Sequence, residues 1–319
     1  MIEEAKCERR IDEMTFRHRW RTALALVMLA AMACVLTACS THDYAESGKK
    51  IIPASSLATY IGKDGYVIVD MQDAESYAAG HVEGAVNITR EDIVISVPVA
   101  NTLTSKNKLQ KLLGEKGVGN DDILVVYDDD RMNASRFFWT MLVYGSENVL
   151  VVDGGLTAIK AAGIKLTDAA PEVTPTEYVA GEKDETWLAT MDDVLSQVNE
   201  PDGNVVLLDV RTNAEYEASG KVPSSVMWDY ADNFYKDGTF KSVETTRINY
   251  VQKDMAPEKS IIVYCQTSMR AAPVFLRLYD AGYRNIRIYD GAYLEWSSNP
   301  SNPIDMPSGA VVPSGKDAS

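Results

Sequence analysis

The stretch "IIVYCQTSMRAAPVFLRLYDAGYRNIRIYDGA", Ile261–Ala292, contains two short apolar runs with a segment of helical period between them. Short continuous apolar runs that alternate with helical segments indicate buried parallel strands connected by a covering helix. The helix is predicted over 271–281, because Gly282 suits the position after a helix end and Pro273 falls in the first turn, where a missing N–H costs little. The stretch therefore predicts strand, helix and strand, with Cys265 where the first strand ends.

The chain contains a second copy of this stretch. The segment "ILVVYDDDRMNASRFFWTMLVYGSENVLVVDGG" (Ile123–Gly155) aligns with it so that Tyr127 matches Tyr264 and Asp153 matches Asp290, both 137 residues apart. A constant offset between matching strands and turns indicates an internal repeat of one structural unit.

A further pair of matching segments precedes the two copies. They are "VIVDMQDAESYAAGHVEGAVNI" (Val67–Ile88) and "LLDVRTNAEYEASGKVPSSVMW" (Leu207–Trp228). Each is a buried apolar run that ends in aspartate, followed by a helical turn with an aromatic residue and then by a glycine, a basic residue and a valine. Each unit thus contains two such segments in the same order.

These repeats predict an α/β fold with two tandem domains, each a parallel sheet flanked by helices, at residues 50–165 and 187–300. Residues 166–186 are rich in proline, threonine and acidic side chains, which is typical of an extended linker. Residues 301–319 are rich in proline, serine and glycine and are predicted to form a disordered tail.

The beginning of the chain has the features of a bacterial export signal. Arg17, Arg19 and Arg21 lie directly before the apolar run Thr22–Leu36, which is shorter than the roughly 20 residues of a membrane span. The run ends in "LTAC", which resembles the lipobox whose cysteine, here Cys39, is lipidated. We expect a lipoprotein signal peptide at 1–38, a lipidated tether at 39–49, and a protein anchored to a membrane of the cell envelope, facing the periplasm or the cell exterior. The alternative is a cleaved secretory signal in which Cys39 is incidental.

The net charge of the exported part is strongly negative. The chain has 31 basic and 46 acidic side chains, of which residues 1–38 hold six and five, so 25 and 41 remain and the net charge is near −16. Such a surface repels nucleic acid and anionic membranes, so neither is an expected partner. Membrane attachment would therefore rest on the lipid alone.

Cys265 is the one thiol expected to stay free after export, because Cys7 and Cys34 leave with the signal and Cys39 carries lipid. A lone thiol outside the cytoplasm is a liability unless it is buried or used. Between a strand and a helix it would face backbone N–H groups and the positive end of a helix dipole, and Arg270 would add a full charge. These groups would lower the thiol pKa and make Cys265 a nucleophile. The alternative is a buried and inert cysteine.

The paired segments resemble the two signature regions of the rhodanese domain, and their tandem order resembles the thiosulfate and 3-mercaptopyruvate sulfurtransferases. The segment "YKDGTFKS" (Tyr235–Ser242) is also like the stretch that these enzymes carry between the signature regions of their second domain. The resemblance implies that Cys265 takes up sulfur as a persulfide and that Arg211, in "DVR", contacts the anionic substrate. The loop that would surround the transferred sulfur consists of Gln266, Thr267, Ser268, Met269 and Arg270.

Dual-specificity phosphatases share this fold and also have a loop between a cysteine and an arginine. Their loop is longer and surrounds a tetrahedral phosphate, whereas the four residues between Cys265 and Arg270 suit a single sulfur atom. Three positions depart from the sulfurtransferase pattern. Gln266 replaces the basic residue usual in thiosulfate enzymes or the glycine usual in mercaptopyruvate enzymes, Ser268 replaces a glycine, and Arg270 stands where threonine is common. The charge at Arg270 favours thiosulfate as the donor.

The first copy is predicted to be inactive. Asp128 stands where the second copy has Cys265, and Gln72 stands where it has Arg211. A carboxylate cannot carry a sulfane sulfur, and Asp128 with the two aspartates that follow would repel an anionic donor. We expect a domain that packs against its partner and forms one wall of the cleft. The alternative is a cation site made of the three aspartates, although adjacent acidic residues usually form a solvated surface.

The sequence therefore predicts a sulfurtransferase that moves sulfane sulfur from thiosulfate or 3-mercaptopyruvate to a thiol or cyanide through a Cys265 persulfide. Neither a cofactor nor a metal is expected, because His42 and His81 lie far apart and no second thiol gives a zinc pattern. A monomer is expected. The alternative is a non-catalytic rhodanese-like lipoprotein that binds or scaffolds other molecules, and the mass of the protein after incubation with thiosulfate would distinguish the two.

Overall fold

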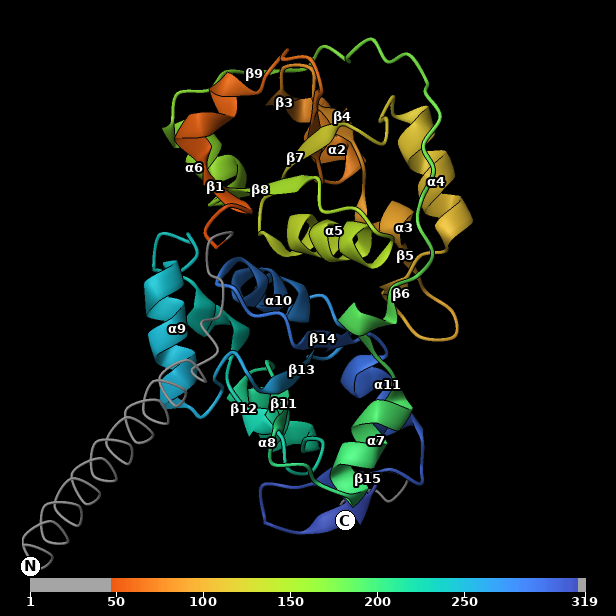
Figure 1. The fold of residues 1–319 in the computed structure, drawn as a ribbon, viewed down its shortest axis with the longest axis vertical. Coiled ribbons are helices and arrows are strands. Elements are labelled where there is room, and N and C mark those ends of the chain that lie inside the picture. Colours follow the sequence, from red (N-terminus) through yellow and green to blue (C-terminus); the bar gives the residue numbers. More distant parts are fainter. Residues whose placement is uncertain (1–46, 315–319) are drawn as a thin grey trace, which may run out of the picture. The chain divides into compact units, whose positions relative to one another are not determined.

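The computed structural model describes residues 47–314 (Figure 1). The predicted signal peptide, the predicted lipidation site Cys39 and residues 315–319 lie outside the described residues. Within residues 47–314, no helix is both long and apolar enough to cross a membrane.

The first domain is built on a five-stranded sheet in which every pairing is parallel. In spatial order its strands are β1 (Ile51–Pro53), β8 (Val149–Asp153), β7 (Ile123–Tyr127), β2 (Tyr66–Asp70) and β4 (Val86–Asn87). The three inner strands are continuous apolar runs with most residues buried, as expected for a sheet that is covered on both faces. The helices of this domain are η1 (Ala54–Thr59), α2 (Ala74–Ala79), α3 (Arg90–Ile93), α4 (Lys106–Glu115), α5 (Met132–Val143) and α6 (Gly155–Ala161).

The second domain repeats this arrangement with a second parallel five-stranded sheet. Its strands are, in spatial order, β10 (Leu188–Ala189), β14 (Ile286–Tyr289), β13 (Ser260–Tyr264), β11 (Val205–Asp209) and β12 (Val226–Met227). Its helices are η2 (Glu185–Trp187), α7 (Met191–Asn199), α8 (Asn213–Ser219), η3 (Tyr230–Asn233), α9 (Val243–Gln252), α10 (Ala271–Asp280) and α11 (Ala292–Ser298). The predicted α/β fold with two tandem domains is confirmed.

The central helices α5 and α10 pack against each other and join the two domains (Figure 1). All ten residues of α10 are buried, because one side covers its own sheet and the other side faces α5. An aromatic contact crosses the interface, with Phe138 of α5 packed edge-on against Tyr279 of α10. One hydrophobic core therefore runs through both domains.

Each domain also has a short arm. The first arm, residues 94–103, is a hairpin in which β5 (Val94–Ile95) pairs with β6 (Thr102–Leu103). The second arm, residues 234–240, is closed by an antiparallel bridge between Phe234 and Phe240. The two arms occupy equivalent places in the repeat.

The arms are exchanged between the domains. The backbone N–H of Leu103 donates to Asp290 Oδ2 at the end of β14 (2.7 Å). In the matching contact, 137 residues apart on both sides, the N–H of Phe240 donates to Asp153 Oδ1 at the end of β8 (2.9 Å). Each arm therefore binds the aspartate that follows a central strand of the other domain.

The prediction of a disordered tail is wrong for residues 301–314. β15 (Pro303–Asp305) and β16 (Val311–Pro313) form an antiparallel hairpin. The hairpin is attached to the second domain because Lys221 and Asp305 exchange both backbone hydrogen bonds, at 3.0 and 2.9 Å. Ile304 is buried in the core. The proline, serine and glycine content favoured the prediction of disorder, because the two short strands are stabilised by pairing with the domain and not by their own composition.

The linker is extended, since residues 168–184 form neither helix nor strand. It nevertheless packs against the first domain, where Tyr178 and Ala180 are buried and the N–H of Thr176 donates to the carbonyl oxygen of Gly114 (2.9 Å). A side chain at Gly114 would collide with the carbonyl oxygen of Thr176, so this close approach needs glycine.

Candidate active site

Cys265 lies directly after β13, where the chain leaves the sheet for a loop (residues 266–270) that leads into α10. The carboxyl ends of parallel strands are where α/β folds place their ligands. The side chain is buried, with 1% of the residue exposed, and it is the one free cysteine among residues 47–314. Its carbonyl oxygen accepts a hydrogen bond from the N–H of Tyr293 (2.9 Å), which ties the loop to α11.

Two opposing effects act on this thiol. Backbone N–H groups of Thr267, Arg270 and Ala271, together with the charge of Arg270, stabilise a thiolate, whereas burial favours the neutral thiol. Burial is the larger effect and raises the pKa of Cys265 above its ordinary value. The prediction of a lowered thiol pKa is therefore wrong in its net direction. The sequence shows which groups the loop contains, but not how deeply the sulfur lies.

The first domain contains the same loop in the same conformation. Arg131 has φ 68° and its counterpart Ser268 has φ 56°, a left-handed conformation that non-glycine residues seldom adopt. The carbonyl oxygen of Asp128 accepts the N–H of Leu156 (2.9 Å), as that of Cys265 accepts the N–H of Tyr293. The loop geometry therefore does not depend on the cysteine.

The carboxylate of Asp128 fills the centre of this first-domain loop. Its Oδ1 accepts the N–H of Arg131 (2.6 Å) and its Oδ2 accepts the N–H of Ala134 (2.9 Å). Burial raises the pKa of Asp128 to about 7, and the nearby Asp130 adds to the shift. The loop is thus a cup of backbone N–H groups that favour an anionic acceptor, and in this copy the acceptor is a carboxyl group of the protein.

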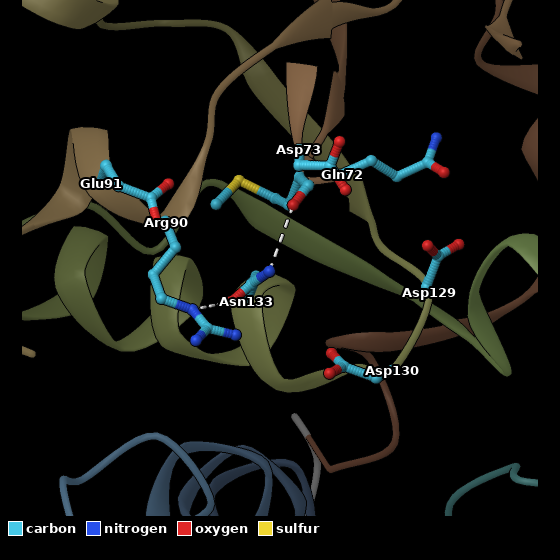
Figure 2. A pocket seen from close by; sticks show the side chains of 8 residues that line it. Gln72, Asp73, Arg90, Glu91, Asp129, Asp130 and Asn133 are labelled. Carbon is cyan, nitrogen blue, oxygen red and sulfur yellow. Dashed lines mark hydrogen bonds between the residues drawn. The ribbon is translucent and has the colours of Figure 1, made fainter. Parts of the chain in front are cut away.

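A cavity of about 230 Å³ lies beside the first-domain loop (Figure 2). Its lining includes Asp129, Asp130 and Arg90, whose Nε donates to Asn133 Oδ1 (2.9 Å). Asp128 turns into the cup while the next two aspartates line this cavity, and among residues 47–314 no group of three or more histidine, cysteine, aspartate or glutamate side chains could hold a metal ion. The acidic lining opposes the entry of an anionic sulfur donor.

Glu215 binds the arginine of the second-domain loop. Arg270 Nη1 and Nη2 donate to Glu215 Oε2 and Oε1, both at 2.6 Å, in a bidentate ion pair. This contact is the main cause that lowers the pKa of Glu215 to about 2. The charge of Arg270 still acts on Cys265.

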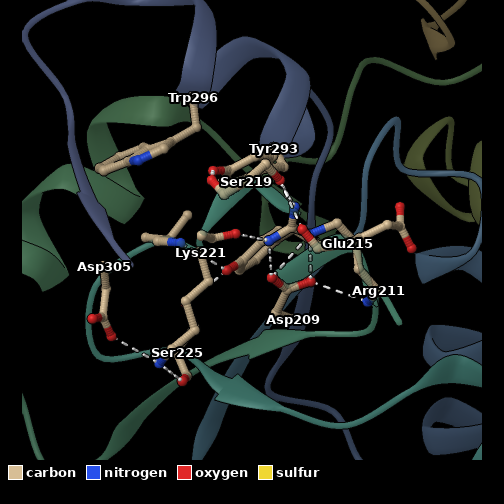
Figure 3. Close-up of polar contacts among 12 residues, drawn as sticks. Asp209, Arg211, Glu215, Ser219, Lys221, Ser225, Tyr293, Trp296 and Asp305 are labelled. Carbon is tan, nitrogen blue, oxygen red and sulfur yellow. Dashed lines mark hydrogen bonds and ion pairs between the residues drawn. The ribbon is translucent and has the colours of Figure 1, made fainter. Parts of the chain in front are cut away.

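Arg211 is enclosed in a network of its own (Figure 3). Its Nη2 forms an ion pair with Asp209 Oδ2 (2.6 Å), and further hydrogen bonds lead to Ser219 Oγ and to the carbonyl oxygen of Gly220. The guanidinium lies 3.7 Å from the centre of the Tyr293 ring, and the residue has no exposed surface. Arg211 is therefore held by Asp209, Ser219 and Gly220 at the end of its strand.

The first domain shows what this position does. Gln72, the counterpart of Arg211, donates from Nε2 to Asp70 Oδ2 (2.8 Å) and to the carbonyl oxygen of Gly80 (3.5 Å). A neutral amide makes the same contacts in a copy that has no thiol. Arg211 therefore connects a strand end to the turn after the next helix, and the substrate contact that the resemblance implies for it stays a prediction.

The other loop residues differ in their access to solvent. Gln266 and Thr267 keep part of their surface, whereas Ser268 and Met269 are buried. Met269 packs in the hydrophobic core that also contains Cys265. Of the predicted substrate-binding side chains, Gln266, Thr267 and Arg270 are therefore the accessible ones.

Two side chains of the first domain reach this loop. Asn101, in the first arm, donates from Nδ2 to Thr267 Oγ1 (3.1 Å). Arg136, in α5, donates from Nη1 to Ser268 Oγ (2.9 Å). The expectation that the first domain forms one wall beside the loop agrees with these contacts.

Three residues at the site were not predicted from the sequence: Glu215, Asn101 and Arg136. Glu215 was signalled by the spacing from Thr212, since Ser/Thr-x-x-Glu before a helix is a capping box, which α8 contains. Arg136 was signalled by its position in an otherwise apolar helical run, where a charge requires a partner. Nothing in the sequence indicates that Asn101 crosses to the other domain.

Comparison with known proteins identifies the family. The rhodanese-like domain model matches residues 53–162 and 190–299. A thiosulfate sulfurtransferase of Corynebacterium glutamicum is 28% identical over 284 residues, which cover 83% of this chain and 92% of that protein. The sulfur carrier protein TtuD of Thermus thermophilus is 30% identical over 251 residues, 73% of this chain and 88% of that protein.

Among solved structures, the anaerobic ergothioneine biosynthesis enzyme from Chlorobium limicola has the same fold, with a TM-score of 0.73 and 20% identity over 81% of this chain and 70% of that chain. Two parallel-sheet domains, each with an anion cup between a central strand and a helix, define the class of tandem rhodanese folds. The chain belongs to the rhodanese-like domain family and is a sulfurtransferase.

Proposed function

We propose that this sulfurtransferase carries sulfur as a persulfide on Cys265. The observation that supports the proposal is the first-domain loop, in which the same backbone N–H cup binds the carboxylate of Asp128. In the second domain, N–H groups of Thr267, Arg270 and Ala271 face the sulfur of Cys265. A cup that binds an anion in one copy suits an anionic persulfide in the other.

The two half-reactions balance without an external oxidant. The Cys265 thiolate attacks the sulfane sulfur of thiosulfate, a new S–S bond forms, the donor S–S bond breaks, and sulfite leaves with the electron pair. Cyanide or an acceptor thiolate then attacks the outer sulfur, leaves as thiocyanate or as a persulfide, and regenerates the Cys265 thiolate. With 3-mercaptopyruvate a C–S bond breaks instead, and the carbon takes up a proton to give pyruvate.

Thiosulfate is the proposed donor. The positive charge of Arg270 beside the cup favours a dianion, and a relative over nearly the whole described chain is named as a thiosulfate sulfurtransferase. Glu215 neutralises part of this charge, so the attraction is weaker than for an unpaired arginine. 3-Mercaptopyruvate is the second donor to compare.

We further propose that the enzyme acts as a lipid-anchored monomer in the cell envelope, facing the periplasm or the cell exterior. The support is the "LTAC" sequence at Cys39 and the apolar run before it. Membrane contact would be made by the lipid, because the acidic protein surface is repelled by anionic headgroups.

The first test is the intact mass of the protein after incubation with each donor. The wild-type protein should gain one sulfur atom from thiosulfate and lose it again to cyanide. Cys265→Ser should gain none and should lose essentially all sulfur transfer, because an oxygen atom at this position cannot form the persulfide. Transfer that persists in Cys265→Ser would refute the proposal. A wild-type protein that takes sulfur from neither donor would favour the scaffold alternative.

A further inference from the structure

Arg136 is a fully buried cation at the interface of the two domains. Besides its bond to Ser268 Oγ, its Nη2 donates to Asp290 Oδ1 (2.7 Å) and to the carbonyl oxygen of Asn101 (2.9 Å). The guanidinium lies over the ring of Trp139, 4.3 Å from its centre. A buried charge is costly unless it is paired and hydrogen-bonded. The presence of Arg136 in a helix that is otherwise apolar here therefore points to a role for its contacts.

The partners of Arg136 converge on one residue of the catalytic loop. Ser268 has a positive φ, which is unfavourable for a residue with a side chain. Its Oγ accepts the bond from Arg136 and in turn lies 3.3 Å from Asp290 Oδ1. Arg136 and Asp290 therefore hold the strained residue from two sides, one from each domain.

The two loops differ in what holds them. In the first domain the carboxylate of Asp128 accepts hydrogen bonds from the cup and fixes its N–H groups. In the second domain the central group is a thiol, which is a weak acceptor. The catalytic cup therefore has no strong internal acceptor before sulfur is bound, and support from outside the loop replaces it.

We propose that Arg136 is a positioning residue that holds the catalytic loop through Ser268, so that the thiol-free domain completes the active site of the other. The inference rests on the proposed role of Cys265. Arg136 touches neither the sulfur nor the donor, so its effect should fall on turnover more than on donor binding.

The test is a double-mutant cycle in the full-length enzyme with Arg136→Met, Ser268→Ala and both together. Arg136→Met should lower kcat by about tenfold or more, with KM within about threefold of wild type. Ser268→Ala removes one hydroxyl, leaves the ion pair with Asp290, and should lower kcat by about threefold to tenfold. The double variant should be no worse than Arg136→Met, because both changes break the same contact.

Two variants separate positioning from general stability. Arg136→Lys keeps the charge but not the planar fork and should recover part of the lost kcat. Arg131 supplies the matched control, because its Nη1 also crosses to the other domain, to the carbonyl oxygen of Gly238 (2.9 Å), which lies in the second arm and not in the loop after Cys265. Arg131→Met should leave kcat within about twofold of wild type.

The rate of Cys265 alkylation by iodoacetamide gives a readout that does not depend on sulfur transfer. Arg136→Met and Ser268→Ala should alkylate faster than wild type while turning over more slowly, since the released loop no longer encloses the sulfur. The proposal would be overturned if folded Ser268→Ala had the kcat and the alkylation rate of the wild type. It would also be overturned if the losses of kcat in the two single variants added up in the double variant. If Cys265→Ser retained sulfur transfer, the proposed function would fail. The alkylation rates of Arg136→Met and of the wild type, both of which keep Cys265, would still show whether Arg136 holds the loop.

Discussion

Among single residues, Arg270 and Glu215 control the charge beside Cys265. Arg270 is the strongest influence that opposes the effect of burial on the thiol, and Glu215 neutralises part of it through two hydrogen bonds. Changes at these two positions should therefore move the thiol pKa in opposite directions.

The pH dependence of Cys265 alkylation tests this balance. Because burial raises the pKa of Cys265, the thiolate fraction is small at neutral pH and the rate should climb into the alkaline range. Arg270→Ala should move the midpoint to higher pH and Arg270→Lys should move it less, whereas Glu215→Gln should move it to lower pH.

The same variants should change catalysis. A charge-assisted hydrogen bond contributes roughly 1.5–3 kcal/mol, so Arg270→Ala should lose about tenfold to hundredfold in kcat/KM for thiosulfate. Near-normal turnover and an unshifted alkylation profile in Arg270→Ala would show that the backbone cup acts alone.

At the level of strands and helices, the two strand–loop–helix units differ mainly in the group inside the cup. Asp128→Ala would leave buried N–H groups without an acceptor and should reduce the free energy of unfolding by about 1–3 kcal/mol. Turnover should stay within a few-fold of wild type, because that copy contains no thiol. Urea unfolding and kcat/KM measure the two effects, and lost activity in a fully stable variant would contradict the prediction of a catalytically silent first domain.

The stability difference between wild type and Asp128→Ala should depend on pH. The folded pKa of Asp128 is about 7 and its ordinary value is 3.8, so the contribution of this carboxyl group is fully present below the lower value and is lost as the pH rises through the upper one. The variant should therefore differ most from wild type near pH 4 and least above about pH 7. A pH-independent difference would show that folding does not shift the pKa of Asp128.

These units also show how much the sequence could predict. α10 ends at Asp280, one residue before the predicted end at 281. The prediction is close because Pro273 and Gly282 fix the two helix ends through local backbone effects, which the sequence shows directly. The contacts of Arg211 with Asp209 and Gly220 could not be predicted, because a residue after a strand can face the loop or the turn beside it. Arg136 and Asn101 could not be assigned, because their partners lie in the other domain, more than 130 residues away.

For the whole chain, the prediction concerns the attachment to a membrane. Cys39→Ala should abolish incorporation of labelled palmitate, because the "LTAC" motif would lose the thiol that is acylated. The variant should accumulate as unprocessed precursor or appear in the soluble fraction. Palmitate labelling equal to that of the wild type would rule out this site, and Cys265→Ser, which leaves the motif intact, is the control.

The exchanged arms have a consequence for the history of the duplicated chain. Since each arm binds the aspartate of the opposite copy, deleting either half would remove a support from the half that remains. The fold of a copy does not need a thiol in its loop, as Asp128 shows, whereas its arm and its interface helix contact the other copy. The residues of one loop can therefore differ between the halves, but each half depends on the other for its stability.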